Sequence, residues 1–221
     1  DISTSTTDNR DGLEDATGSV LVCAVGANTG SFDFTLASDA SGASWGDLPW
    51  KTLGLSAPYN SDAWNNRIRY AVVTNFAMPA STFPLKTNLG ATGPANTLDI
   101  YCRSPGSSAT AAPGCLASSS PAYIVSQDVA FVVYSSGANG WGTTGFADLA
   151  IRTPFTASQL TFAPDEAMNA PEKKATPALR KQFLTRDRTD STSSAGEFDD
   201  LISFMPRAKL AARLMSAGFY P

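Results

Sequence analysis

The residues nearest the start of the chain that could do chemistry are oxygen donors at alternate positions. Their spacing is that of a loop wrapped around a calcium ion, and Gly12 would allow the sharp turn that such a loop needs. The predicted ligands are Thr7, Asn9, Asp11 and Asp15. Threonine stands at the first position, where aspartate is usual. The alternative interpretation is an acidic turn that holds no metal.

Two pairs of adjacent carboxylates, Asp165-Glu166 and Asp199-Asp200, are the next candidates. Glycoside hydrolysis needs two carboxylates facing each other across a cleft. Neighbouring residues on a strand point to opposite faces of the sheet. For Asp199-Asp200 we therefore favour a strand edge or a salt-bridge role, with Arg67 and Arg69 as partners from a neighbouring strand or subunit.

Several enzyme classes are excluded by what the sequence lacks. The 221 residues contain no histidine, which removes Ser-His and Cys-His nucleophile pairs and most zinc sites. No Gly-x-Ser-x-Gly motif is present, and no motif supports Lys51 or Lys209 as a catalytic base. The glycines of 137–142 are not followed by the Gly-Lys-Ser/Thr of a phosphate loop. We expect no catalytic residues and no enzymatic activity.

The composition favours a folded domain with few charges. Apolar residues make up 43% and charged residues 16%, and the net charge is −4. A negative chain does not predict a basic face for nucleic acid, so no nucleic-acid partner is expected. The longest apolar run, 129–134, is far shorter than the roughly 18–20 residues of a membrane span. We interpret it as a buried strand.

The three cysteines are an odd number. Cys102 and Cys115 flank a loop rich in Ser, Ala, Gly and Pro that has no hydrophobic core of its own to fix it. A disulfide between them would stabilise the fold by roughly 3 kcal/mol and would place the protein outside the cytoplasm. Cys23 would then be unpaired, with a partner expected upstream of Asp1. The alternative is two buried free thiols.

Four tryptophans could line a partner or sugar surface, although large aromatic side chains more often lie in cores and interfaces. We expect Trp50 and Trp64 to be core residues. Trp141 follows a glycine-rich turn and is the better candidate for a surface contact.

Hydrophobic alternation places the secondary structure. Strands are predicted, in chain order, at residues 31–36, 67–73, 98–102, 128–134 and 198–205. Turns are expected at 62–66 and 135–140, and loops at 39–47 and 141–196. Pro206 and Gly218 predict a helix over 207–217. Strands and helices do not alternate, so an antiparallel sheet is expected.

Four of these segments carry a family resemblance. They contain the motifs Leu-Pro-Trp-x-Thr-Leu-Gly, a Trp-Asn turn that leads into a strand, a central strand with a Ser-x-Gly-x-Asn-Gly turn, and an Asp-Asp-hydrophobic ending. The segments are Gly46–Leu55, Asp62–Val72, Val129–Gly140 and Phe198–Ile202. In this order they resemble the globular domains of type IV pilin-like proteins and type II secretion pseudopilins.

The resemblance implies an α+β, pilin-like fold. Its antiparallel sheet would have long loops and a short C-terminal helix, and the N-terminal spine helix of the family would be missing. It predicts a single globular domain, 1–221. The parts are an N-terminal loop region (1–47), a sheet core (48–140), a long variable loop region (141–197), and the last strand with the C-terminal helix (198–221).

The function implied is that of a structural subunit, a minor pilin or another filament protein of a type IV pilus or type II secretion system. It would act by assembly, with surface adhesion through residues 141–196 as a further expected role. Its partners would be other pilin subunits, in homo- or hetero-filaments, and the pilus assembly machinery. It would contact a membrane only through the missing helix. Before assembly it would lie on the periplasmic face of the inner membrane, and afterwards at the cell surface. The alternative is an extracellular carbohydrate- or ligand-binding β module with a calcium loop.

Overall fold

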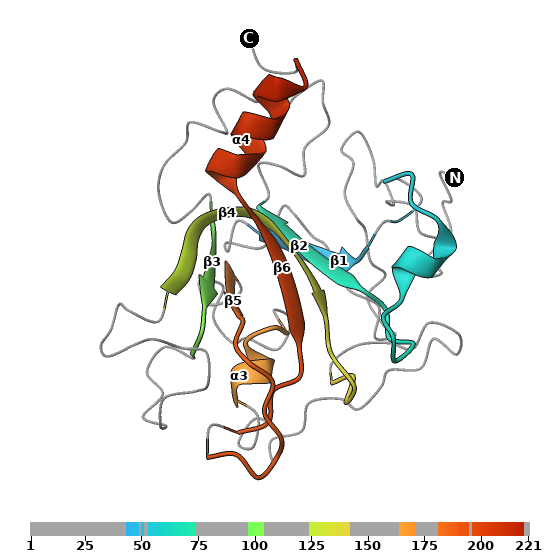
Figure 1. Cartoon of the computed structure of the whole chain (residues 1–221), viewed down its shortest axis with the longest axis vertical. Coiled ribbons are helices and arrows are strands. Elements are labelled where there is room, and N and C mark those ends of the chain that lie inside the picture. The colour runs from blue at the N-terminus through green and yellow to red at the C-terminus, as the bar shows by residue number, and fades with distance from the viewer. Residues whose placement is uncertain are drawn as a thin grey trace.

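The computed structural model describes residues 43–48, 50, 53–73, 97–103, 124–141, 164–170, 181–194 and 196–218. This part of the chain forms a mixed α+β fold around one sheet (Figure 1). The strands are β1 (Ala43–Asp47), β2 (Arg69–Val73), β3 (Leu98–Tyr101), β4 (Ile124–Ser135), β5 (Gln182–Leu184) and β6 (Leu201–Pro206). The helices are η1 (Ala57–Asn60), α3 (Pro164–Ala167) and α4 (Arg207–Ser216).

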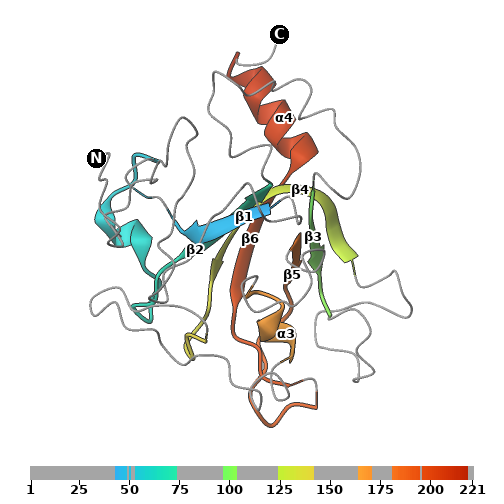
Figure 2. The same ribbon diagram turned by 180° about the vertical axis from the view of Figure 1, so that it is seen from behind.

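The sheet is arranged around β4. Its strand order is β1-β2-β4-β3-β5, and β6 also pairs with β4. Every pairing is antiparallel except that of β3 with β5, which is parallel. Figure 2 shows the same arrangement from behind, with α3 below the end of β5.

One face of the sheet carries the hydrophobic core. Buried and half-buried residues alternate along β2 and β3, as expected for strands that bury one face. The core cluster is Trp45, Ala71, Val73, Leu98, Ile100, Val129, Val132, Tyr134 and Phe183. Ile202 and Phe204 of β6 pack against it. The cluster includes Trp45 of β1 and Phe183 of β5, so the core extends from one edge strand of the main strand order to the other.

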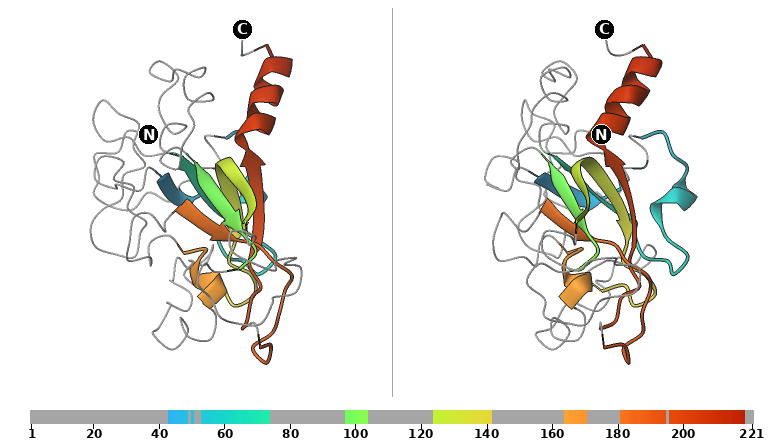
Figure 3. Two further views of the ribbon diagram at one scale, coloured as in Figure 1. Left: turned by 90° about the vertical axis from the view of Figure 1, so that its left-hand side faces the viewer. Right: turned by 60° about the vertical axis from the view of Figure 1, so that its left-hand side comes forward.

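Strand β4 is long and bent. Asp128 has a left-handed φ of 59°, and the register with β6 shifts between Val129 and Phe131. An irregularity of this kind bends a strand and increases its twist. Accordingly, β4 arches across the end of the sheet in Figure 3, and the sheet curls.

The predicted central strand and several neighbouring elements are confirmed. The strand predicted at 128–134 lies within β4, and those at 67–73 and 98–102 correspond to β2 and β3. In the predicted turn at 62–66, Asn65 has a φ of 64°. The C-terminal helix also forms as expected, and Gly218 follows it with a φ of 76°.

Other predictions were wrong. The stretch 39–47 was expected to be a loop, but its last five residues form β1. The region 141–196 contains β5 and α3, and β5 makes the sheet partly parallel. The last strand begins at Leu201 rather than at Phe198, so Asp199 and Asp200 precede it.

Neither of the two tryptophans predicted to be core, Trp50 and Trp64, belongs to the core cluster. Trp64, predicted to be core, is 41% exposed, whereas Trp45 is buried in the core cluster. Trp50 and Trp141 are half-buried.

Some predicted features fall outside the described residues. These are the calcium loop at Thr7–Asp15, the strand at 31–36, and both Cys23 and Cys115. Cys102 is disulfide-bonded, and its partner also lies outside the described residues. Among the residues described, no helix has the length and hydropathy to cross a membrane.

The extent of the core predicts that two truncations of aliphatic side chains will change the free energy of unfolding by different amounts. Leu98 on β3 is fully buried, whereas Val125 on β4 is half exposed. Leu98→Ala should lower the free energy of unfolding by about 2–5 kcal/mol, because it removes buried contacts and leaves a cavity. Val125→Ala should change it by no more than about 0.5 kcal/mol. Urea unfolding measures both, and equal losses would contradict this assignment of the core.

Candidate functional site

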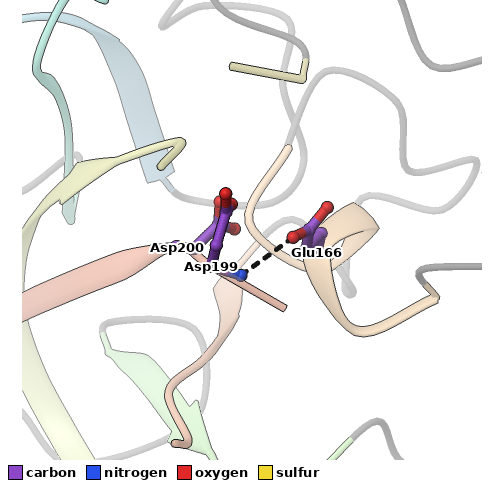
Figure 4. Close-up of side chains that lie close together, drawn as sticks. All are labelled: Glu166, Asp199 and Asp200. Atoms are coloured by element: carbon purple, nitrogen blue, oxygen red, sulfur yellow. Dashed lines mark hydrogen bonds between the residues drawn. The ribbon is translucent and has the colours of Figure 1, made fainter. Parts of the chain in front are cut away.

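Three carboxylates gather where α3 meets the segment before β6. Glu166, Asp199 and Asp200 each bring one oxygen to a group whose members lie within 4.8 Å of one another (Figure 4). The three residues are only 1%, 6% and 8% exposed, respectively. Buried carboxylates need hydrogen bonds or opposite charges, because ionised groups are costly to remove from water.

Asp199 stabilises the turn that follows β4 through hydrogen bonds. Its Oδ2 accepts hydrogen bonds from the backbone N–H groups of Ala138 (2.8 Å) and Asn139 (3.1 Å). Gly137 has a φ of 61°, and a Cβ atom at this position would collide with the Asp199 carboxylate. The turn therefore requires glycine both for its backbone conformation and for the close approach of Asp199.

Glu166 joins the same turn to the segment that leads into β6. Both of its carboxylate oxygens accept from Asn139 Nδ2 at 3.0 Å, and Oε1 also accepts from the Asp199 backbone N–H at 2.9 Å. Figure 4 draws this last bond between α3 and the chain before β6. One buried carboxylate thus positions two segments that are distant in sequence.

Asp200 is connected to β5 through Asn169. Asn169 Nδ2 donates to Asp200 Oδ2 at 2.8 Å and to the Leu184 carbonyl at 3.0 Å, while its Oδ1 accepts the Leu184 N–H at 2.8 Å. The amide side chain therefore pairs with the backbone at the end of β5 and with the acidic cluster at once.

Two arginines contribute the positive charge near the cluster. Arg186 Nε pairs with Asp165 Oδ2 at 2.8 Å, and the guanidinium lies 4.6 Å from the centre of the Phe198 ring. Arg69 of β2 is fully buried and lies 5.4 Å from the centre of the Tyr134 ring. Both arginines interact electrostatically with Asp200 and lower its pKa.

The arginines do not offset the burial of the carboxylates. Burial, followed by the charges of Asp200 and Asp199, raises the pKa of Glu166 to about 9. Burial is also the main reason that the pKa of Asp200 is raised to about 8. Counted over the described part of the chain, and with Asp165 included, four carboxylates lie near two arginines, so full ionisation of these groups would leave two excess negative charges.

This excess can be removed by bound protons or by a cation. Hard divalent cations such as Ca²⁺ take carboxylate and amide oxygens as ligands. Within the described ranges, Asp199 Oδ1 is buried and has no hydrogen-bond partner, so it could serve as a ligand to a cation. Among the residues described, this group fits a divalent cation in both charge and donor type.

A surface hollow reaches one side of the cluster. A cavity of about 340 Å³ is lined by Val133, Ser135, Arg186, Asp200 and Leu201, among others. Asp200 is the member of the cluster that borders this hollow, and it is itself buried.

The structure changes the interpretation of the paired carboxylates. They were expected to point to opposite faces of a strand, but Asp199 and Asp200 precede β6, and both approach Glu166. The expected pairing of Arg69 with this region agrees with its electrostatic effect on Asp200. Arg67 instead lies 3.7 Å from Asp47 of β1.

The asparagines at 139 and 169 were missed as site residues. The only sequence signal was their polar amide side chains, one in the Ser-x-Gly-x-Asn-Gly turn and the other just after Asp165-Glu166. Their role depends on contacts between distant segments, which local patterns do not reveal.

Comparisons with known proteins identify no relative. No family model, curated protein or solved structure matches the chain.

The raised pKa values predict that stability depends on pH when a chelator removes divalent cations. Between the ordinary value of 4.5 and the raised value of about 9, Glu166 keeps a proton in the folded state that it releases on unfolding. The stabilisation is therefore complete below about pH 4.5 and is lost as the pH rises toward 9. Urea unfolding at pH 5, 7 and 9 measures it.

Glu166→Gln should flatten this pH dependence because it removes the titrating group. Asp190→Asn is the matched control, since Asp190 is exposed and lies outside the cluster. A pH dependence of the same steepness in wild type and Glu166→Gln would contradict the assignment.

A calcium titration tests the cation interpretation. At pH 8, Ca²⁺ at a hundred times its dissociation constant should stabilise the fold by about 2.7 kcal/mol and raise Tm by about 5–10 °C. Asp199→Asn should abolish most of this rise, because it removes one charge and the available Oδ1. Exposed Asp187→Asn should leave it intact. If Ca²⁺ does not change Tm, the cluster holds protons instead.

Proposed function

We propose that this chain is the globular part of a structural subunit in a type IV pilin-like or type II secretion-like filament. It acts by assembling with other pilin-type subunits and with the pilus assembly machinery, and catalyses no reaction. No nucleic acid takes part. Its place is the cell surface, reached from the periplasmic face of the inner membrane.

The observation that carries this proposal is the meeting of three of the resembling segments. Ser135 Oγ donates to Asp62 Oδ2 at 2.6 Å, which joins the turn after β4 to the turn before β2. Asn66 Nδ2 donates to the Gly137 carbonyl at 2.8 Å. Asp199 then holds the same turn from the other side.

Segments that resemble one family therefore form one hydrogen-bonded junction. Each motif is short, and none carries an argument alone. Because the motif side chains bind backbone or side-chain groups of the other motifs, the architecture explains their residue types. This supports a structural role for the motifs over a catalytic one.

The disulfide at Cys102 supports the proposed location. Disulfides persist mainly in oxidising compartments, such as the periplasm and the cell surface. A bonded Cys102 fits a domain that folds after export.

A second candidate is a cation-dependent ligand-binding β module. The acidic cluster favours it, as do two exposed aromatic residues near η1, Tyr59 (62% exposed) and Trp64 (41% exposed). Exposed aromatic rings can stack on sugars or bind partners.

Labelling of surface filaments separates the two candidates. Antibodies against the chain should decorate filaments sheared from the cells that produce it, and cells lacking the gene should show no label. Unlabelled filaments, together with glycan binding that a chelator abolishes, would favour the second candidate.

Two neighbouring asparagines provide a matched pair of variants. Asn66→Ala removes the buried bond to Gly137 and should cost about 1–3 kcal/mol of stability and reduce filament labelling. Asn65→Gly should preserve both, because glycine adopts the φ of 64° found at this position without strain. If both variants label filaments equally, the hydrogen bond from Asn66 is not needed for filament assembly, and the junction loses its proposed role.

A further inference from the structure

We propose that copies of this chain associate head to tail, with α4 of one copy contacting the loop between β5 and β6 of the next. The inference deepens the proposed function by naming a contact between subunits. It depends on the proposed function in one respect, because a filament subunit is what makes a second copy of the chain the expected partner.

The C-terminal end of the molecule is positively charged. Residues 201–221 contain Arg207, Lys209 and Arg213 and no acidic residue. Arg207 is used internally, since it pairs with Asp128 at 3.0 Å. Lys209 and Arg213 are exposed and four positions apart, so they lie on the same side of the helix. α4 extends beyond the sheet (Figures 1 and 2).

The opposite end carries negative charge. We call residues 185–194, 196 and 197 the acidic loop. Its exposed charged residues are Asp187, Arg188 and Asp190, and Glu197 is half-buried. Arg186 is used internally, because it pairs with Asp165. The acidic loop therefore offers three carboxylates and one cation to a partner.

The acidic loop is held in place by its own hydrogen bonds. Arg186 donates to the Thr189 hydroxyl at 2.6 Å and to the Gly196 carbonyl at 3.2 Å. Thr189 Oγ1 donates to the same carbonyl at 2.6 Å. A loop fixed in this way presents its charges without a large entropic cost on binding.

The two charged ends lie at opposite ends of the long axis. In Figure 1, where this axis is vertical, α4 lies at the top and the acidic loop at the bottom. Complementary charges at opposite ends favour a heterologous contact, which repeats from copy to copy instead of closing into a dimer. Such exposed ion pairs are weak and sensitive to salt. The contact therefore suits a filament in which other surfaces add to the affinity.

A zero-length cross-link tests the contact directly. A mixture of ¹⁴N- and ¹⁵N-labelled chains is treated with a carbodiimide, which joins a lysine to a carboxylate only where the two touch. We expect links from Lys209 to Asp187 or Asp190 between differently labelled copies at about 0.01 M salt, where the Debye length is about 30 Å. These links should fade several-fold at about 1 M salt, where it is about 3 Å. Lys209 links only within one copy, or to other carboxylates, would overturn the proposal.

A charge exchange provides the second test. Lys209→Glu with Arg213→Glu, or Asp187→Lys with Asp190→Lys, should each abolish the attraction between copies, measured by light scattering at low salt. An equal mixture of the two variants should restore it, because each then carries the complement of the other. A mixture that stays repulsive would overturn the proposal.

Arg188→Glu makes the acidic loop more negative and leaves α4 unchanged, so it should strengthen the attraction. Circular dichroism checks that each variant is folded.

If filaments are labelled but these links and exchanges fail, the head-to-tail contact is wrong and the filament proposal stands. If the links form but filaments are never labelled, the head-to-tail contact stands and the filament proposal is wrong.

Discussion

The cost of burying negative charge governs the region where α3, the turn after β4 and the start of β6 meet. Four carboxylates lie there beside two arginines. A buried carboxylate without compensation is expensive, so each must find donors, protons or a cation. Several residue types in the surroundings follow from this need. Gly137 gives Asp199 room, and Asn139 and Asn169 supply side-chain amide donors to Glu166 and Asp200.

The acidic cluster and the hydrophobic core are parts of one structure. Arg69 belongs to β2, where its side chain lies on the buried face over the ring of Tyr134. A fully buried guanidinium needs nearby negative charge, which Asp200 supplies. Loss of Asp200 would remove negative charge from beside a guanidinium buried in the core, so a substitution in the cluster should also destabilise the core.

The sequence predicted the elements whose hydrophobic pattern is strong. β4 is a long apolar strand, and α4 has Pro206 before it and Gly218 after it. β1 and β5 could not be found in this way, because they are short and mix polar with apolar residues. They become strands because a neighbouring strand of the sheet provides hydrogen bonds.

The acidic cluster illustrates the same limit. Both carboxylate pairs were visible in the sequence, but their meeting depends on Asn169 binding β5 and on β5 joining β3. The rule that neighbouring strand residues face opposite ways is sound, but it was applied to residues that precede the strand. Local patterns identify candidate groups, and long-range pairing decides which of them meet.

The parallel pairing of β3 with β5 has a consequence for the order of folding. Ile100 pairs with Phe183, so a large part of the chain must be synthesised and a long loop closed before this pair can form. The antiparallel partners β1 and β2 are much closer in sequence and can pair earlier. Until β5 arrives, the edge of β3 that it will occupy is open to strands from other molecules. During this interval a newly synthesised chain is most vulnerable to aggregation, and a chaperone that shields this edge would be most useful.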